Sequence, residues 1–336
     1  MIFSKLSGLI RLGNWWHYKI PPLIAIFFFS EEIFGEHTIG EIWYKLLLLI
    51  CWMFSAASFG YFINDWSDVA EDGLAGKKNL VARLSVPLRW LFAFCMPALA
   101  ILIQVLINGF YSTAFLLSVG HLVFFILYSV PPFRLKHYLL PAIFCDSLYA
   151  HVLPSAIVFT SICNTKDCLP LLFLLCASQF TGGVRNILLH HLFDRKNDLV
   201  SGNSNFANKF HSLFILKIVN RLLLPLDLLL VLIFFSFVSI YLVYIFSALV
   251  LFRLFLVHVC WRIKRLWLNK KMSYWLLNDV YEGYIPFISI LLFSLSSLKI
   301  FIVLCVVYPF VFPHFVTGLV NDMRHINYYL KSISCR

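Results

Sequence analysis

Six of the chain's sixteen aspartate and glutamate residues fall in two short segments. The first segment, residues 64–72, reads NDWSDVAED. Its Asp65, Asp68 and Asp72 are three and four residues apart, a spacing that stacks side chains on one face of a helix. Carboxylates stacked in this way repel one another, so the arrangement is stable only when a cation neutralises it.

The second segment, residues 194–198, reads DRKND and places Asp194 and Asp198 four residues apart. Clustered oxygen ligands suit Mg²⁺, which prefers a few carboxylates together with phosphate oxygens and water. The two segments could face each other and hold a diphosphate through Mg²⁺. The alternative is that they are ordinary solvated loop acids, but two such clusters in a chain so poor in acids favour the metal site.

The composition indicates that the bilayer is the main solvent of this chain. Of its 336 residues, 61% are hydrophobic and 13% charged, and the mean hydropathy is +0.86. Soluble domains average about 45–50% apolar and about 25% charged residues, so a soluble domain is excluded. Because lipid offers no hydrogen bonds to the backbone, we predict an all-α polytopic membrane protein.

Nine apolar stretches are long enough to cross a bilayer, whose core of about 30 Å needs roughly 20 apolar residues in a helix. They are residues 20–36, 42–63, 88–109, 111–130, 138–160, 169–192, 213–235, 237–260 and 284–312. We therefore predict about nine transmembrane helices in a single membrane domain, 1–336. Residues 1–19 are expected as an interfacial helix, 20–312 as the transmembrane bundle and 313–336 as a C-terminal tail.

The basic residues predict the orientation of these helices. The net charge is +11, and the lysines and arginines are concentrated at the N-terminus and in the loops after even-numbered spans, where both acidic segments also lie. The opposite loops hold essentially Lys166. By the positive-inside rule, the loops with the acidic segments are cytoplasmic. This distribution fits an anionic membrane surface better than nucleic acid, so no nucleic-acid partner is expected.

A third segment makes the pattern specific. Residues 64–72 match the NDxxDxxxD motif of the UbiA superfamily of intramembrane prenyltransferases, and residues 194–198 match its second motif, DxxxD. Between them, residues 128–136 read YSVPPFRLK, which resembles the family's YSxPPxRxK segment at the end of the fourth helix. The three motifs occur in the family's order, so the chain resembles a member of this superfamily.

The resemblance implies a helical bundle around a central cavity that opens to lipid. Family members bind a polyprenyl diphosphate through Mg²⁺ held by the two aspartate motifs, which here comprise Asp65, Asp68, Asp72, Asp194 and Asp198. They ionise the C1–O bond, and an acceptor captures the allylic cation. The expected activity is therefore Mg²⁺-dependent transfer of an isoprenyl group to a small aromatic or lipidic acceptor within the membrane.

Cations and one phenol are candidates for stabilising the leaving diphosphate, since fixed positive charge lowers the energy of a developing anion. Tyr128, Arg134 and Lys136 are assigned as catalytic. Four further residues near the first motif are expected to bind the diphosphate: Asn64, Lys77, Lys78 and Arg83. For each basic residue, the alternative is a positive-inside anchor without contact to substrate.

Polar residues at membrane depth are costly and are often functional. Arg185 and His190 precede Asp194 on adjoining helix faces, so they could line the cavity near the diphosphate. His190 could also serve as a base or as a hydrogen-bonded structural histidine. Asp146 is the candidate for the acceptor site, with an internal helix–helix hydrogen bond as its alternative.

Other reactions remain open at this point. A UbiA-type terpene cyclase would turn over without an acceptor, and a phosphoribosyltransferase acting on a polyprenyl phosphate would require a sugar diphosphate donor. An ion-coupled transporter is a remote alternative, because the carboxylates lie at loop depth and transporter ion sites usually lie near the bilayer midplane.

The predicted orientation can be tested by labelling. Single cysteines replacing Ser67 and Ser201 should react with a membrane-impermeant thiol reagent from the same side of the membrane, because both acidic segments follow even-numbered spans. Labelling of the two positions from opposite sides would contradict the predicted topology.

Overall fold

The computed structural model describes residues 7–35, 37–74, 76–163, 166–200, 206–264, 278, 280–294 and 306–334. Within these ranges the regular elements are helices and no strand occurs, which confirms the all-α fold class. The described residues form two compact units. One comprises residues 1–16 and 34–230, and the other residues 17–33 and 231–336.

Five helical stretches are long and apolar enough to cross a membrane. They are Ile39–Ser67, Val86–Asn108, Leu139–Ile162, Lys166–Arg195 and Ser212–Val238. Three shorter apolar helices are Thr113–Ser129, Ile240–Leu256 and Val280–Phe293. Each of these eight stretches, which were found among the described residues, overlaps a predicted span, so the chain is an integral membrane protein with several apolar helices.

The first unit contains the chain's longest helices and both acidic segments. In chain order its elements are α3 (Ile39–Ser67), α4 (Val69–Leu74), η1 (Val81–Arg83), α5 (Val86–Asn108), α6 (Thr113–Ser129), η2 (Leu135–His137), α7 (Leu139–Ser147), η3 (Leu148–Val152), α8 (Leu153–Ile162), η4 (Lys166–Cys168), α9 (Leu169–Val200), α10 (Phe206–Lys209), α11 (Ser212–Ile218) and η5 (Val219–Leu223). The unit also includes the start of α12 (Leu224–Val238).

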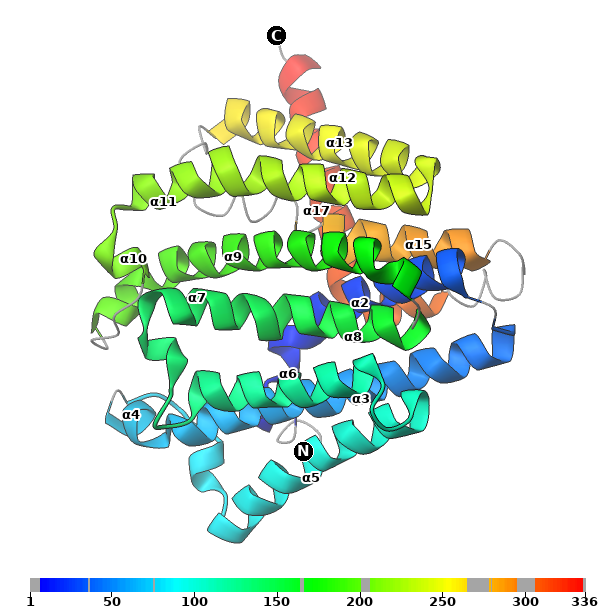
Figure 1. Cartoon of the computed structure of the whole chain (residues 1–336). Helices are drawn as coiled ribbons and strands as arrows, with labels where there is room; N and C mark the ends of the chain where they lie inside the picture. The colour runs from blue at the N-terminus through cyan, green and yellow to red at the C-terminus, as the bar shows by residue number, and fades with distance from the viewer. Residues whose placement is uncertain are drawn as a thin grey trace. The chain divides into compact units, whose positions relative to one another are not determined.

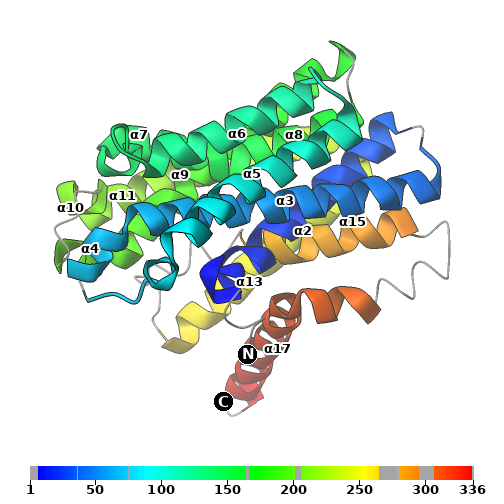
Figure 2. The same cartoon turned by 90° about the horizontal axis from the view of Figure 1, so that it is seen from below.

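The long helices of this unit lie side by side (Figures 1 and 2). Helix α3 packs against α5 and α6, α8 against α6 and α9, and α7 against α9. The approach of α3 to α6 is close at Gly60, where an added Cβ would lie 2.3 Å from the Phe125 ring. A larger side chain at Gly60 would therefore separate the two helices that carry the first and third motifs.

The polar segments of the first unit gather at one end of its helices. Figures 1 and 2 place α4, α10 and the beginning of α7 at the same end, and α10 packs against α9. Helix α4 contains the end of the first acidic segment, α7 follows the YSVPPFRLK segment, and α9 carries the second acidic segment. The fold thus brings the ends of three separate helices to one end of the unit.

In the part of the chain that the structure describes, three turns of π-helix interrupt the helices: η3, η5 and η7 (Val280–Tyr284). Such turns are rare and often lie at functional sites. At η3, the backbone carbonyl of Tyr149 bonds to His121 Nε2 of α6 at 2.8 Å, so the interruption is fixed by a neighbouring helix.

Helix α2 (Leu12–Phe34) differs from the predicted boundary between an interfacial helix and the first span. The helix begins after Arg11, whose φ is +48°, and continues through Lys19 without a break. Lysine has a high helix propensity, so its charge does not end the helix. The predicted tail, 313–336, likewise contains a helix, α17 (Pro313–Ser334).

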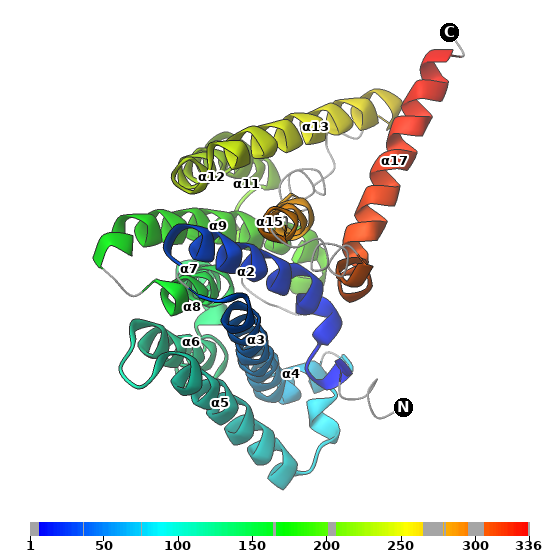
Figure 3. The same cartoon turned by 90° about the vertical axis from the view of Figure 1, so that its right-hand side faces the viewer.

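The second unit contains residues 17–33 of α2, α13 (Ile240–Lys264), η7, α15 (Ile285–Ser294) and α17. A buried ion pair joins α13 to α17, which lie close together in Figure 3: Arg253 Nη1 lies 2.6 Å from both carboxylate oxygens of Asp322. The Tyr284 hydroxyl also donates to Asp322 at 2.5 Å. Because both charges are almost fully buried, their pairing is necessary for α17 to pack.

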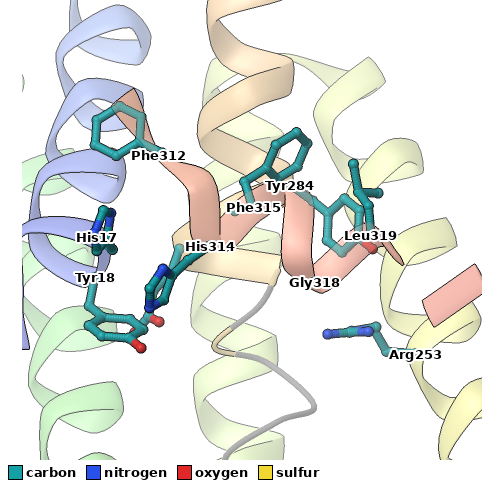
Figure 4. A pocket seen from close by; sticks show the side chains of 11 residues that line it. His17, Tyr18, Arg253, Tyr284, Phe312, His314, Phe315, Gly318 and Leu319 are labelled. Atoms are coloured by element: carbon teal, nitrogen blue, oxygen red, sulfur yellow. The ribbon is translucent and has the colours of Figure 1, made fainter. Parts of the chain in front are cut away.

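This ion pair lies beside a small, partly open pocket (Figure 4). Figure 4 shows His17 and His314 next to each other, and their rings stack with centroids 4.3 Å apart. Arg253 and Tyr284 contribute to its wall, together with Glu282. The pocket is therefore enclosed mainly by aromatic and paired polar groups.

Removing Asp322 should destabilise the second unit. Asp322→Ala leaves the Arg253 guanidinium buried without its carboxylate, which should cost about 3–5 kcal/mol of unfolding free energy. Unfolding of the purified protein in a denaturing detergent titration would measure this loss. Arg253→Met combined with Asp322→Leu should recover most of it, whereas Asn321→Ala on the exposed face should change it by less than about 0.5 kcal/mol. Equal stability of Asp322→Ala and Asn321→Ala would contradict the argument.

Candidate active site

Asp68 is the meeting point of the first and third motifs. Arg134 Nη2 donates to Asp68 Oδ1 at 2.7 Å, and Lys136 Nζ also contacts this oxygen. The second terminal nitrogen of Arg134, Nη1, lies 2.6 Å from Glu71 Oε1. Asp68, Arg134 and Lys136 each have side chains no more than one-fifth exposed, so these charges act in partly dehydrated surroundings.

The local sequence explains why Arg134 turns back towards Asp68. Helix α6 ends at Ser129, and Pro131 and Pro132 cannot continue it because they lack a backbone N–H donor. A turn follows, in which Arg134 N donates to Val130 O at 3.0 Å and Arg134 adopts a φ of +41°. This left-handed residue reverses the chain before η2 and aims both cations at the end of α3.

Asn64 joins the same group. Its Oδ1 accepts hydrogen bonds from Lys136 Nζ at 3.0 Å and from Ser129 Oγ at 3.3 Å. Burial lowers the pKa of the Lys136 ammonium, while the neighbouring Asp68 carboxylate acts in the opposite direction. The Asn64 side chain therefore links the end of α6 to the end of α3.

Asp65 has a partner that the sequence analysis did not identify. Arg11 Nη2 lies 2.7 Å from Asp65 Oδ1, and Arg11 Nε donates to Asp65 Oδ2 at 3.0 Å. The Asp65 side chain is only 7% exposed, whereas that of Arg11 is 42% exposed. Arg11 was predicted on the same side of the membrane as the first motif, so a contact with Asp65 was possible. The two residues are 54 positions apart, however, and the sequence alone did not indicate that they pair.

Asn79 organises the loop after the first motif. Its Nδ2 donates to Asp65 O at 2.7 Å and to Asp72 Oδ2 at 2.9 Å. Its Oδ1 accepts from the backbone N–H groups of Val81 and Ala82 at 3.0 and 3.2 Å. One amide thus connects the acidic segment to the turn at η1, a role that the sequence analysis missed.

The carboxylates are not preassembled around a metal. Among the described residues, no three His, Cys, Asp or Glu side chains converge on one point that could hold an ion. The reason is visible in the pairing: Asp65 faces Arg11, Asp68 faces Arg134 and Lys136, and Asp72 faces Asn79. The donor set nevertheless fits Mg²⁺, because Asp65, Asp68 and Asp72 offer carboxylate oxygens, which are ligands that this ion prefers.

The second acidic segment lies at the end of α9. Asp194 Oδ2 is 3.3 Å from His190 Nε2, one helical turn earlier, and both side chains are substantially exposed. The side chain of Asp198 lies outside the described residues. The assignment of Asp194 and Asp198 as metal ligands therefore stays a prediction.

Arg185 forms a buried ion pair that the sequence did not predict, and its expected position near the diphosphate stays a prediction. Its side chain is 1% exposed, and Nε lies 3.3 Å from Asp227 Oδ2 in α12. Asp227 was not singled out in the sequence, because a single acid in an apolar stretch gives no spacing to read. This ion pair joins α9 to α12, so a structural role accounts for Arg185.

Lys77, Lys78 and Arg83 are exposed, and none of their side chains contacts the acidic segment in the part of the chain described. The loop folds back on the acidic segment through its backbone, since Lys77 N donates to Asp72 O at 2.8 Å after Gly76, whose φ is +66°. The role of the three cations in diphosphate binding remains a prediction.

Three comparisons with known proteins bear on this arrangement. A UbiA homologue from Archaeoglobus fulgidus, solved with GPP and Mg²⁺, matches with a TM-score of 0.62 and 18% identity over 85% of this chain and 99% of that one. Another structure of a UbiA homologue from this organism matches over 98% of this chain and 99% of that one, with a TM-score of 0.59 and 18% identity. The chain has the UbiA fold.

A third structure with this fold concerns digeranylgeranylglyceryl phosphate synthase in membranes, and it matches with a TM-score of 0.52 and 17% identity over 88% of this chain and 99% of that one. No protein-family model and no curated protein matches the sequence. The UbiA fold was therefore recognisable from the three motifs and from the structure, whereas whole-sequence similarity was too low to reveal it.

Within the UbiA fold, Tyr128 and Asp146 fall into one cluster through Tyr149. The Tyr149 hydroxyl donates to Asp146 Oδ1 at 2.7 Å, and the Tyr128 and Tyr149 rings pack with centroids 5.0 Å apart. Tyr149 belongs to the π-helix η3 and was missed in the sequence. The hydrogen bond from Tyr149 fixes the orientation of the Asp146 carboxylate. A role in the acceptor site and a structural hydrogen bond between helices would both require such an orientation.

Substitution of Asn79 should loosen the loop that follows the first motif. Asn79→Ala removes two donated and two accepted hydrogen bonds, at about 1 kcal/mol or more for each buried group left unsatisfied. Hydrogen–deuterium exchange should therefore become faster for the amides of residues 79–83. Asn79→Asp is the matched variant, because it can keep the bonds to Val81 and Ala82 but repels Asp72. Unchanged exchange in both variants would show that Asn79 does not organise the loop.

Proposed function

We propose that this chain is an Mg²⁺-dependent prenyltransferase that moves an isoprenyl group from a polyprenyl diphosphate to a small aromatic or lipidic acceptor in the membrane. The observation that carries the proposal is the convergence of Arg134 and Lys136 on Asp68 in a UbiA fold. This convergence unites two motifs that lie on different helices. The proposal includes a single membrane domain with the site loops on the cytoplasmic side.

The solved relatives support the donor and the metal. Structures of the Archaeoglobus fulgidus homologue contain Mg²⁺ with GPP in one case and with DMAPP in the other. We infer the same classes of ligand for this chain: a prenyl diphosphate and Mg²⁺, the metal being held by Asp65, Asp68, Asp72, Asp194 and Asp198. When bound, Mg²⁺ would supply positive charge that stabilises the departing diphosphate.

The chain's own cations act on the same leaving group. Breaking the C1–O bond of the donor leaves its electron pair on the diphosphate, so negative charge accumulates there. Arg134 and Lys136 offer fixed N–H donors, which stabilise such charge most strongly where water is partly excluded. Tyr128, close to the end of α6, is proposed to donate a further hydrogen bond to the diphosphate.

The acceptor completes the reaction. Its nucleophilic atom forms a bond to C1 of the allylic cation, and its proton leaves to a base. Asp146 is the proposed base, oriented by the Tyr149 hydroxyl, with His190 as the second candidate. Aromatic faces such as those of Tyr128 and Tyr149 stabilise a nearby cation through cation–π contact.

Two other reactions of the same fold would use the same donor-side residues. A cyclase would quench the cation within the prenyl chain, and a phosphoribosyltransferase would require a sugar diphosphate. Product analysis with a panel of prenyl diphosphates, each with and without acceptor, separates them. Product formation without acceptor indicates cyclisation, and turnover only with a sugar diphosphate indicates phosphoribosyl transfer. Ion transport across the membrane, with no prenylated or cyclised product, would indicate a transporter.

Loss of Arg134 tests the proposal directly. A hydrogen bond to a charged group contributes about 1.5–3 kcal/mol, so Arg134→Ala should slow turnover by roughly ten- to a hundredfold. Steady-state kinetics on purified protein measures the effect, with size-exclusion chromatography to confirm folding. Lys217→Ala, which removes an exposed cation from α11, should retain nearly full activity. Equal rates for the two variants would mean that Arg134 is only a topology anchor.

A further inference from the structure

The cations of the site occupy the carboxylates that are proposed to bind the metal. Arg11 pairs with Asp65, and both Arg134 and Lys136 pair with Asp68. Arg11 contacts both carboxylate oxygens of Asp65, and Arg134 and Lys136 share Oδ1 of Asp68, so a metal ion at these carboxylates would lie beside the three cations. Metal binding and these ion pairs therefore compete.

This competition makes the binding of Mg²⁺ alone, or of diphosphate alone, less favourable. A metal that binds Asp65 and Asp68 brings a second positive charge beside Arg11, Arg134 and Lys136 and draws on the carboxylates that neutralise them. Like charges a few ångströms apart repel strongly where water is partly excluded. A diphosphate that binds these cations without metal must instead leave the carboxylates uncompensated.

A diphosphate that arrives with the metal removes both costs. We propose that Arg11, Arg134 and Lys136 exchange partners on loading, from carboxylates to diphosphate oxygens, so that metal and diphosphate bind as a cooperative pair. The inference rests on the proposed function and extends it, because it assigns Arg11 to the binding of the donor. Cooperativity of this kind is reciprocal, since each ligand raises the affinity for the other by the same factor.

The surroundings of Arg11 allow its side chain to make such an exchange. Its backbone is held by the hydrogen bonds Arg11 N to Gly8 O at 3.2 Å and Asn14 N to Arg11 O at 2.8 Å. The preceding Leu9 is buried against Phe62 and Val81. The Arg11 side chain is nevertheless 42% exposed. Its guanidinium can therefore change partner while the Arg11 backbone stays beside the end of α3.

The test separates binding of metal from binding of diphosphate. Isothermal titration calorimetry of the purified full-length protein in detergent would use three probes: Mg²⁺ alone, preformed Mg²⁺–inorganic diphosphate, and inorganic diphosphate with a chelator. Wild-type protein should bind the preformed complex far more tightly than either component. Arg11→Gln should bind Mg²⁺ alone about three- to tenfold more tightly, because a competing cation is gone, and the complex about tenfold more weakly.

Two further variants provide a second test of the exchange and a control for the change in net charge. Lys136→Gln should show the same pair of opposite changes, and it replaces Arg11→Gln if that variant fails to fold. Lys217→Gln also removes one positive charge but lies away from any carboxylate contact among the described side chains, so it should leave both affinities unchanged. A general charge effect would move all three variants alike and would overturn the exchange.

The outcomes distinguish this inference from the proposed function. If wild-type protein does not bind the Mg²⁺–diphosphate complex, the proposed function fails and the inference fails with it. If wild-type protein binds the complex but Arg11→Gln and Lys136→Gln bind Mg²⁺ alone no more tightly than wild type, the exchange is wrong and the proposed function stands. Tighter metal binding with weaker complex binding supports both.

Discussion

The contact of two cations with the Asp68 carboxylate is the interaction on which the arrangement of the site depends. It holds the end of α6 and the segment after it against the end of α3, although more than sixty residues separate the partners. In water such a contact would be weak, but side chains only about one-fifth exposed are screened much less. The apolar bundle therefore supplies the setting in which a few charges determine the local geometry.

Much of this could be predicted from the sequence, because its signals are local. Apolar length indicated the helices, and the three motifs indicated the UbiA fold, whereas the direct contact of Arg134 and Lys136 with Asp68 was not predicted. The exposed position of Lys77 and the pairing of Arg185 with Asp227 could not be foreseen, since they depend on how a loop turns and on which helix lies opposite. Metal ligation and the acceptor stay predictions, because they depend on molecules that the chain's own contacts do not specify.

The buried ion pairs elsewhere in the chain have a different character. Arg185 with Asp227 and Arg253 with Asp322 join helices within their units, and all four side chains are nearly inaccessible. Removing one member of such a pair leaves an uncompensated buried charge, so each pair constrains how its two helices pack. The half-exposed guanidinium of Arg11 contrasts with them, and this difference in accessibility separates charges suited to binding from charges suited to architecture.

The π-helix η3 also changes how positions along the fifth apolar stretch can be compared between proteins. An α-helix advances about 100° per residue, so one inserted residue rotates everything beyond it by that angle. Residues before Leu148 and after Val152 therefore follow two different helical phases. An alignment that treats residues 139–162 as one uninterrupted helix would assign residues on one side of this turn to the wrong face of the helix. Variants chosen from that alignment to change inward-facing residues would instead change lipid-facing ones.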